Sequence, residues 1–310
     1  MSENGGNGIE GLPENVLARK PTLMLVDGMA LLFRAYYATA LKGYIRRTDA
    51  GIPTNGIYGF VRYMWDAIRQ FDPTHVACCW DMGGRTFRTE QFESYKGNRS
   101  AAPDDLVPQF DLVKEVVAAM DIPNIGMPGY EADDCIGTIA KRCAAEMDVQ
   151  VLSGDNDLLQ LVDERVKVII MKKGYGNYQV YTPEFLMEEK GLTPPQIVDM
   201  KGLMGDSSDN YPGVKGIGEK TAVKLVQEFG SIDGVLANLD KVTKSVRTKI
   251  ENDLDMLHLS RSLAEIHCRV PVDCPLDLCE FRIDDAKVSA KFTELEMNSL
   301  GTMMGVGVFD

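Results

Sequence analysis

Two short acidic stretches hold the side chains of this sequence that are best suited to chemistry. Glu131, Asp133 and Asp134 stand in Gly-Tyr-Glu-Ala-Asp-Asp-Cys at 129–135, and Asp155 and Asp157 stand in Ser-Gly-Asp-Asn-Asp at 153–157. Carboxylates gathered this densely repel one another and lose their charge unless a cation lies among them. Hard divalent ions such as Mg²⁺ or Mn²⁺ are the ions that all-oxygen sites select. The pattern therefore predicts a divalent-metal centre.

Helix electrostatics offers a simpler explanation for the first stretch alone. Residues 132–147 have the apolar spacing of a helix, and acidic side chains are favoured at a helix N-terminus. On that helix positions 131 and 134 share one face, so two of the three carboxylates point together. The helix does not account for Asp155 and Asp157, which follow the apolar run 149–152, nor for the acidic groups described next.

Two further apolar runs end in aspartate. Residues 22–27 end in Asp27 and residues 75–81 end in Asp81, and both runs are typical of buried parallel strands. Open α/β sheets bind ligands at the carboxyl ends of their strands, so Asp27, Asp81 and Asp155 are expected to share one site. Helical patterns at 29–40, 56–70 and 111–120 and a strand at 166–171 complete the alternation. Residues 21–190 are thus predicted to form a doubly wound, mostly parallel α/β sheet with helices on both faces.

Residues 83–105 have a different character. They mix cations with aromatic residues and lack a clear apolar face. One interpretation is a solvated surface loop. The other is an exposed segment that contacts a polyanion through its cations and stacks bases on its aromatic rings. The residues concerned are Arg85, Arg88, Lys96 and Arg99, with Phe87, Phe92 and Tyr95.

A second, helical region is predicted for residues 191–310, beginning at Leu-Thr-Pro-Pro (192–195). Asp206 and Asp209 lie three residues apart, a spacing that lets two carboxylates share a cation. The sequence Gly-Val-Lys-Gly-Ile-Gly-Glu-Lys-Thr at 213–221 resembles a nucleotide-binding P-loop, but Glu219 separates the glycine from the lysine. A helix–hairpin–helix at about 196–229 is the better prediction, and a plain helical hairpin is the alternative.

In a helix–hairpin–helix, glycines at the turn let backbone N–H groups meet a phosphate without a side chain in the way. Gly216 and Gly218 suit that turn, and Lys215, Lys220 and Lys224 lie beside it. Such contacts fix position on a duplex and read no sequence. His258 and His267, further along, are interpreted as structural.

Composition bounds the remaining possibilities. The chain has 310 residues, seven cysteines and a net charge of −13. No apolar run reaches membrane-spanning length, and residues 1–20 are predicted to be a disordered tail. An odd number of cysteines without a C-x-x-C pair favours a reduced, cytoplasmic protein, and Cys268, Cys274 and Cys279 fit no zinc-finger spacing. The negative charge argues against a nucleic-acid partner, but local basic patches, such as the one at 241–249, can still follow a phosphate backbone.

Taken together and in this order, the motifs resemble the 5′ nuclease (flap endonuclease-like) family. The resemblance is strongest to the 5′→3′ exonuclease domain of bacterial DNA polymerase I and its stand-alone relatives, and it runs from about residue 22 to the C-terminus. It rests on the strands ending in Asp27 and Asp81, Tyr-Lys-Gly-Asn-Arg at 95–99, Tyr-Glu-Ala-Asp-Asp at 130–134, Ser-Gly-Asp-Asn-Asp at 153–157, and the run 201–221. A stand-alone nuclease is expected, although the same part of a longer polymerase would have the same sequence.

The resemblance implies a PIN-like fold with a helix–hairpin–helix (H3TH) subdomain and two Mg²⁺ ions, which Mn²⁺ can replace. The first ion would be held by Asp27, Asp81, Glu131, Asp133, Asp134 and Asp155, and the second by Asp157, Asp206 and Asp209. Arg34 and Lys96 match positions that hold the scissile phosphate. DNA contacts are implied for Arg85, Arg88, Tyr95, Arg99, Lys201, Lys215, Gly216, Gly218, Lys220 and Thr221, and a K⁺ ion at the hairpin in some relatives.

The function implied is a Mg²⁺-dependent, structure-selective 5′→3′ exonuclease and flap endonuclease. It would act as a monomer on DNA flaps, nicks and RNA–DNA primer junctions in replication and repair, without a membrane. Two alternatives stay open at this point: a non-catalytic protein that binds branched DNA, and a PIN-type ribonuclease with a similar sheet. A general metallophosphatase is a third, more distant one.

Overall fold

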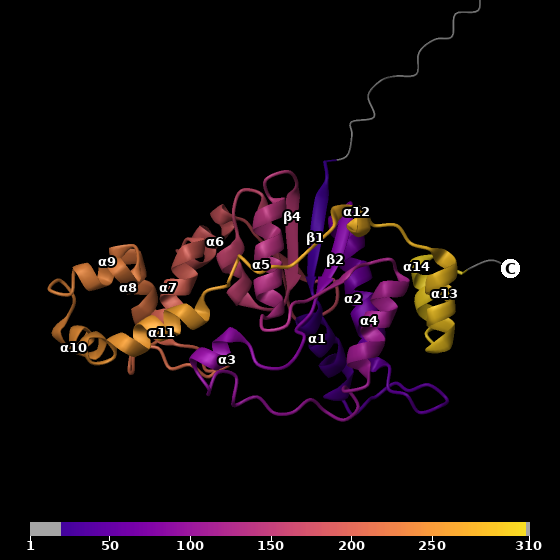
Figure 1. The fold of residues 1–310 in the computed structure, drawn as a ribbon, viewed down its shortest axis with the longest axis horizontal. Coiled ribbons are helices and arrows are strands. Elements are labelled where there is room, and N and C mark those ends of the chain that lie inside the picture. The colour runs from indigo at the N-terminus through magenta and orange to yellow at the C-terminus, as the bar shows by residue number, and fades with distance from the viewer. Residues whose placement is uncertain (1–19, 308–310) are drawn as a thin grey trace, which may run out of the picture.

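A six-stranded sheet forms the centre of the first part of the chain (Figure 1). The computed structural model describes residues 20–307, so the predicted disordered tail lies, except for Lys20, outside the described residues. The sheet order is β3-β2-β1-β4-β5-β6, and every neighbouring pair is parallel except β5 with β6. The strands are β1 Thr22–Asp27, β2 His75–Cys79, β3 Asn124–Ile125, β4 Asp148–Ser153, β5 Val166–Met171 and β6 Tyr178–Tyr181. The predicted mostly parallel, doubly wound sheet is confirmed.

Helices cover both faces of this sheet. Successive side chains of a strand point to opposite faces, and β1 shows the consequence. Met24 and Val26 pack with helices α1, α2 and α4, whereas Leu23 and Leu25 pack with helix α5. All four side chains are fully buried. The helices are α1 Gly28–Ala40, α2 Asn55–Phe71, α4 Gln109–Ala119 and α5 Ala132–Cys143.

The carboxyl ends of three central strands meet at one edge of the sheet because these strands are parallel. β1 ends at Asp27, β2 ends two residues before Asp81, and β4 ends two residues before Asp155. The strand order reverses between β1 and β4, which is where α/β sheets place ligands. Gly28 follows Asp27 and lets Trp80 pack closely against the start of α1, because a Cβ atom on Gly28 would lie 2.5 Å from a ring carbon of Trp80.

Residues 83–105 differ from the expected exposed segment. They contain a short helix, α3 Phe87–Gln91, and two of their polar side chains are buried. Arg88 is 2% exposed and Tyr95 is 4% exposed. The physical reason is that both side chains have buried carboxylates as partners, and a mixed composition does not reveal such partners.

Helices α6 to α11 form the second part of the chain, to the left of the sheet in Figure 1. They follow a short 3₁₀ helix, η1 Asn156–Leu161, and the last two strands. Their apolar side chains, for example Leu203, Leu225 and Ile232, belong to the same buried cluster as the α5 face of the sheet. The helices are α6 Pro183–Lys190, α7 Pro194–Met204, α8 Glu219–Phe229, α9 Ile232–Ala237, α10 Lys244–Asn252 and α11 Leu254–Ala264.

The end of the chain returns to the sheet, on the right in Figure 1. Helix α12 Leu276–Cys279 packs on β2, α13 Asp285–Glu294 on α4, and α14 Asn298–Met304 on α2 and α13. The structure thus differs from the expectation that all of 191–310 forms one helical subdomain. Val288, Phe292 and Leu300 complete the core on the α1–α2–α4 face, and their apolar spacing alone did not say against which face they pack.

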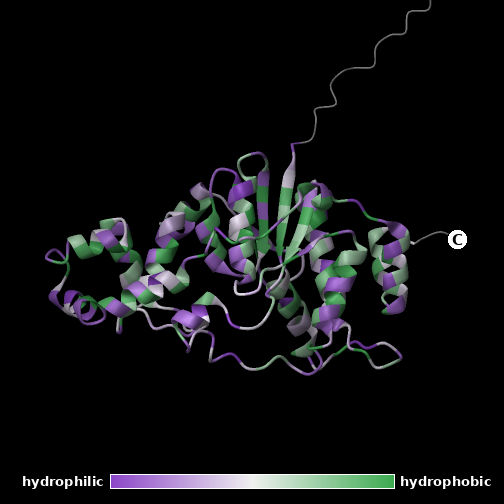
Figure 2. Cartoon of the chain, viewed as in Figure 1, coloured by the Kyte–Doolittle hydropathy of each residue, from purple (hydrophilic) through white to green (hydrophobic). Residues whose placement is uncertain are grey.

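Figure 2 shows hydrophobic residues concentrated in the central strands and on the helix faces that cover them. Among residues 20–307, no helix combines the length and the apolar character that a membrane crossing requires. All seven cysteines are unpaired thiols.

Candidate active site

A cavity of about 220 Å³ opens at the carboxyl edge of the sheet, and acidic side chains surround it. Five of the predicted carboxylates and two of the predicted cations line it together: Asp27, Asp81, Glu131, Asp133 and Asp155, with Lys96 and Arg99. The structure therefore brings together residues that are up to 128 positions apart in the sequence, between Asp27 and Asp155.

Backbone and hydroxyl groups fix three of these carboxylates. Asp27 caps helix α1, because its Oδ1 accepts a hydrogen bond from the Ala30 N–H at 3.0 Å, and its Oδ2 accepts one from the Ser153 hydroxyl at 2.6 Å. Asp81 Oδ1 accepts from the Ala132 N–H at 2.7 Å, and Asp155 Oδ1 accepts from the N–H of residue 157 at 2.8 Å. These bonds hold the acidic groups in place without neutralising them.

The electrostatics of the cavity favour a bound cation. Burial, assisted by the charges of Asp81 and Asp155, raises the pKa of Asp27 to about 6. Burial and the charges of Asp27 and Asp155 likewise raise the pKa of Asp133 well above its ordinary value. In the described part of the chain, no three acidic, imidazole or thiol groups are arranged closely enough to hold a metal ion as they stand. An oxygen-only donor set of this kind fits a hard divalent ion.

Glu131 connects this cavity to the segment 83–105. Its Oε1 accepts a hydrogen bond from Lys96 Nζ at 2.7 Å, and its Oε2 lies 3.1 Å from the Tyr95 hydroxyl. The same hydroxyl lies 2.9 Å from Asp209 Oδ2, and Arg99 donates to Asp209 Oδ1 at 2.7 Å. Tyr95, predicted to contact DNA, is thus a buried link between two acidic groups, and burial beside them raises the pKa of its hydroxyl.

Asp134 does not line the cavity, although the resemblance implied that it faces a metal ion. It is fully buried, and its two oxygens accept four hydrogen bonds: two from Arg88 and one each from the backbone N–H groups of Glu131 and His267. As the helical spacing predicts, Glu131 and Asp134 meet on one face of α5, where they contact the same guanidinium. Arg88, predicted as an exposed DNA contact, is the buried partner of this pair.

The second acidic group lies around Lys201. The Lys201 ammonium forms ion pairs with both Asp157 and Asp206, so a lysine that was predicted to contact DNA instead bridges two predicted metal-binding carboxylates. Burial raises the pKa of Asp157 to about 6, with a contribution from Asp155 and an opposing one from Lys201. Burial acts in the same direction on Asp206, but hydrogen bonds from Lys201 and Ser208 outweigh it and lower the pKa of Asp206 to about 2.

A close approach of two glycines supports the loop that carries Asp206 and Asp209. Gly205 ends α7 with φ of +72°, and Gly213 has φ of +61°. A Cβ atom on Gly213 would lie 2.2 Å from the backbone nitrogen of Gly205. Only glycine allows the two ends of the loop to touch in this way.

The predicted hairpin lies between α7 and α8 and is exposed at its turn. Gly216 has φ of +83°, and Gly218 begins α8 with open space where a Cβ atom would be. Lys215 and Lys220 are exposed, and Thr221 is half-buried. Sequence reasoning did not assign Lys249 to the turn, yet its ammonium donates to the Gly216 carbonyl at 3.0 Å. The signal for it was its membership of the basic cluster at 241–249.

Arg34 and Arg85 lie apart from the acidic cavity. Arg34 Nη1 donates to the Met171 carbonyl at 3.2 Å, and its guanidinium lies 5.8 Å from the ring of Tyr63. Arg85 is exposed, with a long contact of 3.5 Å to the Thr89 carbonyl. The structure therefore does not bring Arg34 into the group of side chains around Lys96.

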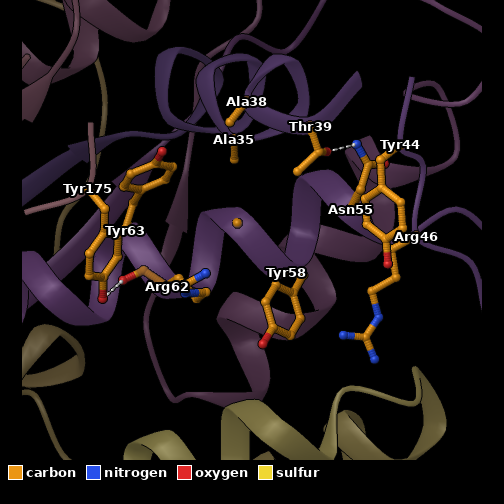
Figure 3. A pocket seen from close by; sticks show the side chains of 11 residues that line it. Ala35, Ala38, Thr39, Tyr44, Arg46, Asn55, Tyr58, Arg62, Tyr63 and Tyr175 are labelled. Carbon is orange, nitrogen blue, oxygen red and sulfur yellow. Dashed lines mark hydrogen bonds between the residues drawn. The ribbon is translucent and has the colours of Figure 1, made fainter. Parts of the chain in front are cut away.

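A second pocket, of about 370 Å³, lies between α1, α2 and the β5–β6 turn (Figure 3). Sequence reasoning missed it because its residues come from three separate segments. Arg46 lies 4.6 Å from the ring of Tyr58, and Arg62 lies 4.8 Å from the ring of Tyr175. Aromatic faces beside guanidinium groups are the chemistry that nucleic-acid bases and phosphates contact.

Family models match almost the whole described chain. The 5′-3′ exonuclease N-terminal resolvase-like domain matches residues 22–191, and the 5′-3′ exonuclease C-terminal SAM fold matches residues 192–287. The first match includes the sheet and the acidic cavity, and the second includes the hairpin and Asp206 with Asp209.

Two curated relatives show how far the similarity extends. A 5′-3′ exonuclease of Bacillus subtilis (strain 168) is 56% identical over 254 residues, which are 82% of this chain and 86% of that protein. DNA polymerase I of Bacillus caldotenax is 44% identical over 283 residues, which are 90% of this chain but 32% of the polymerase. The chain thus spans about a third of the polymerase that it matches.

Solved structures support the fold. The bacteriophage T5 D15 flap endonuclease, in a complex with DNA and metal ions, has a TM-score of 0.65 at 19% identity and covers 91% of this chain and 97% of its own. The catalytic core of Rad2 in complex with a DNA substrate has a TM-score of 0.61 at 15% identity, covering 92% of this chain and 93% of its own. With two family models in series and a relative that is 56% identical, this chain belongs to the 5′-3′ exonuclease family.

Proposed function

We propose that this nuclease is a divalent-metal-dependent 5′→3′ exonuclease and flap endonuclease that hydrolyses phosphodiester bonds at 5′ ends, flaps and nicks of DNA. One observation carries the proposal. Five carboxylates from three strand ends and from the start of α5 surround one cavity, and two cations, Lys96 and Arg99, lie on its wall. Negative groups hold a metal ion, and positive groups beside them attract a phosphate, so the cavity suits phosphodiester hydrolysis.

Asp27, Asp81, Glu131, Asp133 and Asp155 would hold the first Mg²⁺ directly or through water, with Mn²⁺ as a substitute. Bound ions of this kind activate a water molecule and stabilise the leaving oxygen of an in-line displacement. Asp157, Asp206 and Asp209 would hold or shape the place of a second ion. Because the Lys201 ammonium already neutralises Asp157 and Asp206, a second ion there requires the lysine to release at least one of them.

Lys96 is proposed to contact the scissile phosphate. Its side chain is 22% exposed, it is tethered to Glu131, and its ammonium also lies 3.9 Å from Asp209. A cation fixed in this way can neutralise charge that develops on a phosphate without having to reorganise. Arg99, which is 53% exposed and paired with Asp209, would contact an adjacent phosphate. Arg34 would have to leave the Met171 carbonyl to take part.

The hairpin is proposed to hold the duplex. The turn at 215–218 lies at the N-terminus of α8 with Lys215, Gly216 and Gly218 exposed, and Lys220 and Lys249 add positive charge beside it. Phosphate contacts of this type position a duplex without reading its sequence. A K⁺ ion at the turn would strengthen the same contact. Arg85 and the aromatic pocket of Figure 3 are proposed as further contacts to DNA.

RNA–DNA primer junctions in replication and repair are proposed as additional substrates, with the protein acting as a cytoplasmic monomer. The family membership and the exonuclease relative support hydrolysis over a role in binding branched DNA alone. The helical part with its hairpin supports a duplex substrate over the single-stranded RNA of a PIN-type ribonuclease.

A flap-cleavage assay tests the proposal. A 5′-labelled flap duplex is incubated with Mg²⁺, with Mn²⁺ or with EDTA, using the wild-type protein and the Asp133→Ala and Asp206→Ala variants. Cleavage near the junction that EDTA abolishes and both substitutions strongly reduce is the expected result. Tight binding without cleavage in any divalent ion would leave a DNA-binding protein, and faster cleavage of single-stranded RNA than of the flap would favour the ribonuclease.

A further inference from the structure

The guanidinium of Arg88 has every one of its N–H groups engaged inside the protein. A guanidinium offers five N–H donors. Nε donates to the Leu263 carbonyl at 2.9 Å, and Nη2 donates to the Glu265 carbonyl at 2.7 Å and to Asp134 Oδ1 at 2.8 Å. Nη1 donates to Asp134 Oδ2 at 2.8 Å and to Glu131 Oε2 at 3.3 Å. A side chain with five internal partners and 2% exposure has no donor left for DNA.

Arg88 and its partners come from three parts of the fold that are distant in the sequence. Arg88 belongs to α3 in the segment 83–105, Glu131 and Asp134 belong to the start of α5, and the two carbonyls belong to the end of α11. Neighbouring aromatic contacts add to this junction, by which we mean the place where α3, the start of α5 and the end of α11 meet around Arg88. The Phe87 ring lies 5.9 Å from the Tyr130 ring and 5.8 Å from the His267 ring.

The junction determines how Glu131 presents its carboxylate. One oxygen, Oε2, is shared by Arg88 and Tyr95, while the other, Oε1, faces Lys96 in the cavity. On the same face of α5, Arg88 and the backbone N–H groups of Glu131 and His267 hold both oxygens of Asp134, which anchors the first turn of the helix. That turn also carries Asp133, a lining residue of the cavity.

We propose that Arg88 is a positioning residue that aligns Glu131 and the first turn of α5 for metal binding. The inference rests on the proposed function, because it takes Glu131 and Asp133 as metal-binding groups. It adds that the metal site is complete only when the segment 83–105 and the end of α11 are both docked on α5. Residues around a metal site that orient its ligands typically contribute 10–100-fold to metal affinity.

Three variants separate positioning from simple stabilisation. Arg88→Lys keeps the charge but has three donors on one nitrogen, so it cannot reach all five acceptors of the guanidinium. The double variant Arg88→Met with Asp134→Asn removes both buried charges, while the Asn oxygen can still accept from the backbone. Arg142→Ala is the control, because Arg142 lies on the same helix and also holds the returning chain, through the Val272 carbonyl at 3.0 Å, far from the acidic cavity.

Metal affinity is measured on the DNA-free protein by titration with Mn²⁺ and electron paramagnetic resonance. Arg88→Lys and the double variant are expected to bind Mn²⁺ about 10-fold or more weakly than wild type, and the control within about 2-fold of it. In the flap assay, the Mg²⁺ concentration for half-maximal rate should rise by the same factor, and excess Mg²⁺ should restore most of the rate of Arg88→Lys. The Kd for flap DNA in EDTA should change less than about 3-fold.

Several results would overturn the proposal. Unchanged Mn²⁺ affinity in both Arg88 variants would do so, as would an equal loss in Arg142→Ala, which would show general loosening of α5. A weakened Kd for DNA with unchanged metal affinity would make Arg88 a DNA contact. The proposed function fails separately: a wild-type protein that binds Mn²⁺ but cleaves no flap would refute the nuclease activity, and the Mn²⁺ titration would still decide the role of Arg88.

Discussion

The metal-free protein is predicted to become less stable as pH rises from 5 to 7.5. Asp27 and Asp157 both have pKa values of about 6 in the folded protein, above the value of about 3.9 for an aspartate in an unfolded chain. A group whose pKa is raised by folding binds its proton more tightly when folded, so its proton stabilises the fold at low pH. That stabilisation disappears between about pH 4 and pH 6 as the folded protein loses the proton.

The size of the effect follows from the two shifts. Each shift of about two pKa units corresponds to about 3 kcal/mol of unfolding free energy. The two aspartates interact with neighbouring carboxylates and do not titrate independently, so the sum of the two contributions, about 6 kcal/mol, is an upper bound. Asp206 does not oppose this trend. Its pKa in the folded protein is about 2, so the stability that it contributes is lost only as pH falls below about 4. Because the loss from Asp27 and Asp157 runs from about pH 4 to pH 6, only about half of it lies above pH 5, and a net decrease of about 1–3 kcal/mol between pH 5 and pH 7.5 is expected.

Divalent ions should cancel this loss, since a bound cation favours the charged carboxylates that burial disfavours. Urea unfolding at fixed pH, followed through tryptophan fluorescence, measures the free energy with EDTA and with Mg²⁺; buried Trp80 stacks on Phe60 at 5.7 Å and is a suitable probe. The difference between the two conditions should be several-fold larger at pH 7.5 than at pH 5. Asp27→Asn should remove about half of the pH dependence, whereas Asn at the exposed Asp240 should leave it unchanged.

Two results would refute this reasoning. A metal-free stability that is flat or rising between pH 5 and pH 7.5 would mean that the buried carboxylates do not carry raised pKa values. Equal stabilisation by Mg²⁺ at both pH values would mean that the ion binds somewhere other than among these groups.

Three further predictions concern single residues. Lys96→Ala should lower the turnover rate on a flap by roughly 10²–10³-fold with little change in Kd, measured by single-turnover kinetics; a change confined to Kd would place Lys96 in binding only. Gly213→Ala should lower the unfolding free energy by more than about 1 kcal/mol, because its φ is +61° and its Cβ would meet Gly205; an unchanged urea midpoint would contradict this. Lys249→Ala, which removes the cation held at Gly216, should weaken duplex binding equally for all sequences and reduce the salt slope of log Kd by about one; an unchanged slope would exclude a phosphate contact.

Much of the sheet could be predicted because its signals are local and repeated. Apolar runs that end in Asp27 and Asp81, and the run that precedes Asp155, indicated parallel strands, and parallel strands must present these ends at one edge. The short β3 and the antiparallel β6 were not predicted. β3 has two residues, too few to show the alternation of a strand. β6 is half-buried along most of its length, so it lacks the continuous apolar run that marked the predicted strands.

The partners of single polar side chains could not be predicted from sequence. Arg88 and Tyr95 stand in a segment without an apolar period, so nothing local distinguishes a buried cation from an exposed one. Their partners are as far away as Leu263, 175 residues along the chain. The family resemblance implied that Lys201 contacts DNA, but its charge lies between two carboxylates that only the tertiary fold brings together.

The returning C-terminal helices have a consequence for synthesis on the ribosome. Helices α2 and α4 emerge early, yet their apolar surface is covered by Val288, Phe292 and Leu300 of α13 and α14. Since chains are made from the N-terminus and domains begin to fold during translation, the α/β unit must wait for nearly the whole chain before its core is closed. A polypeptide released after α11 would leave that surface exposed to chaperones and to aggregation, even though every carboxylate of the cavity had already been made.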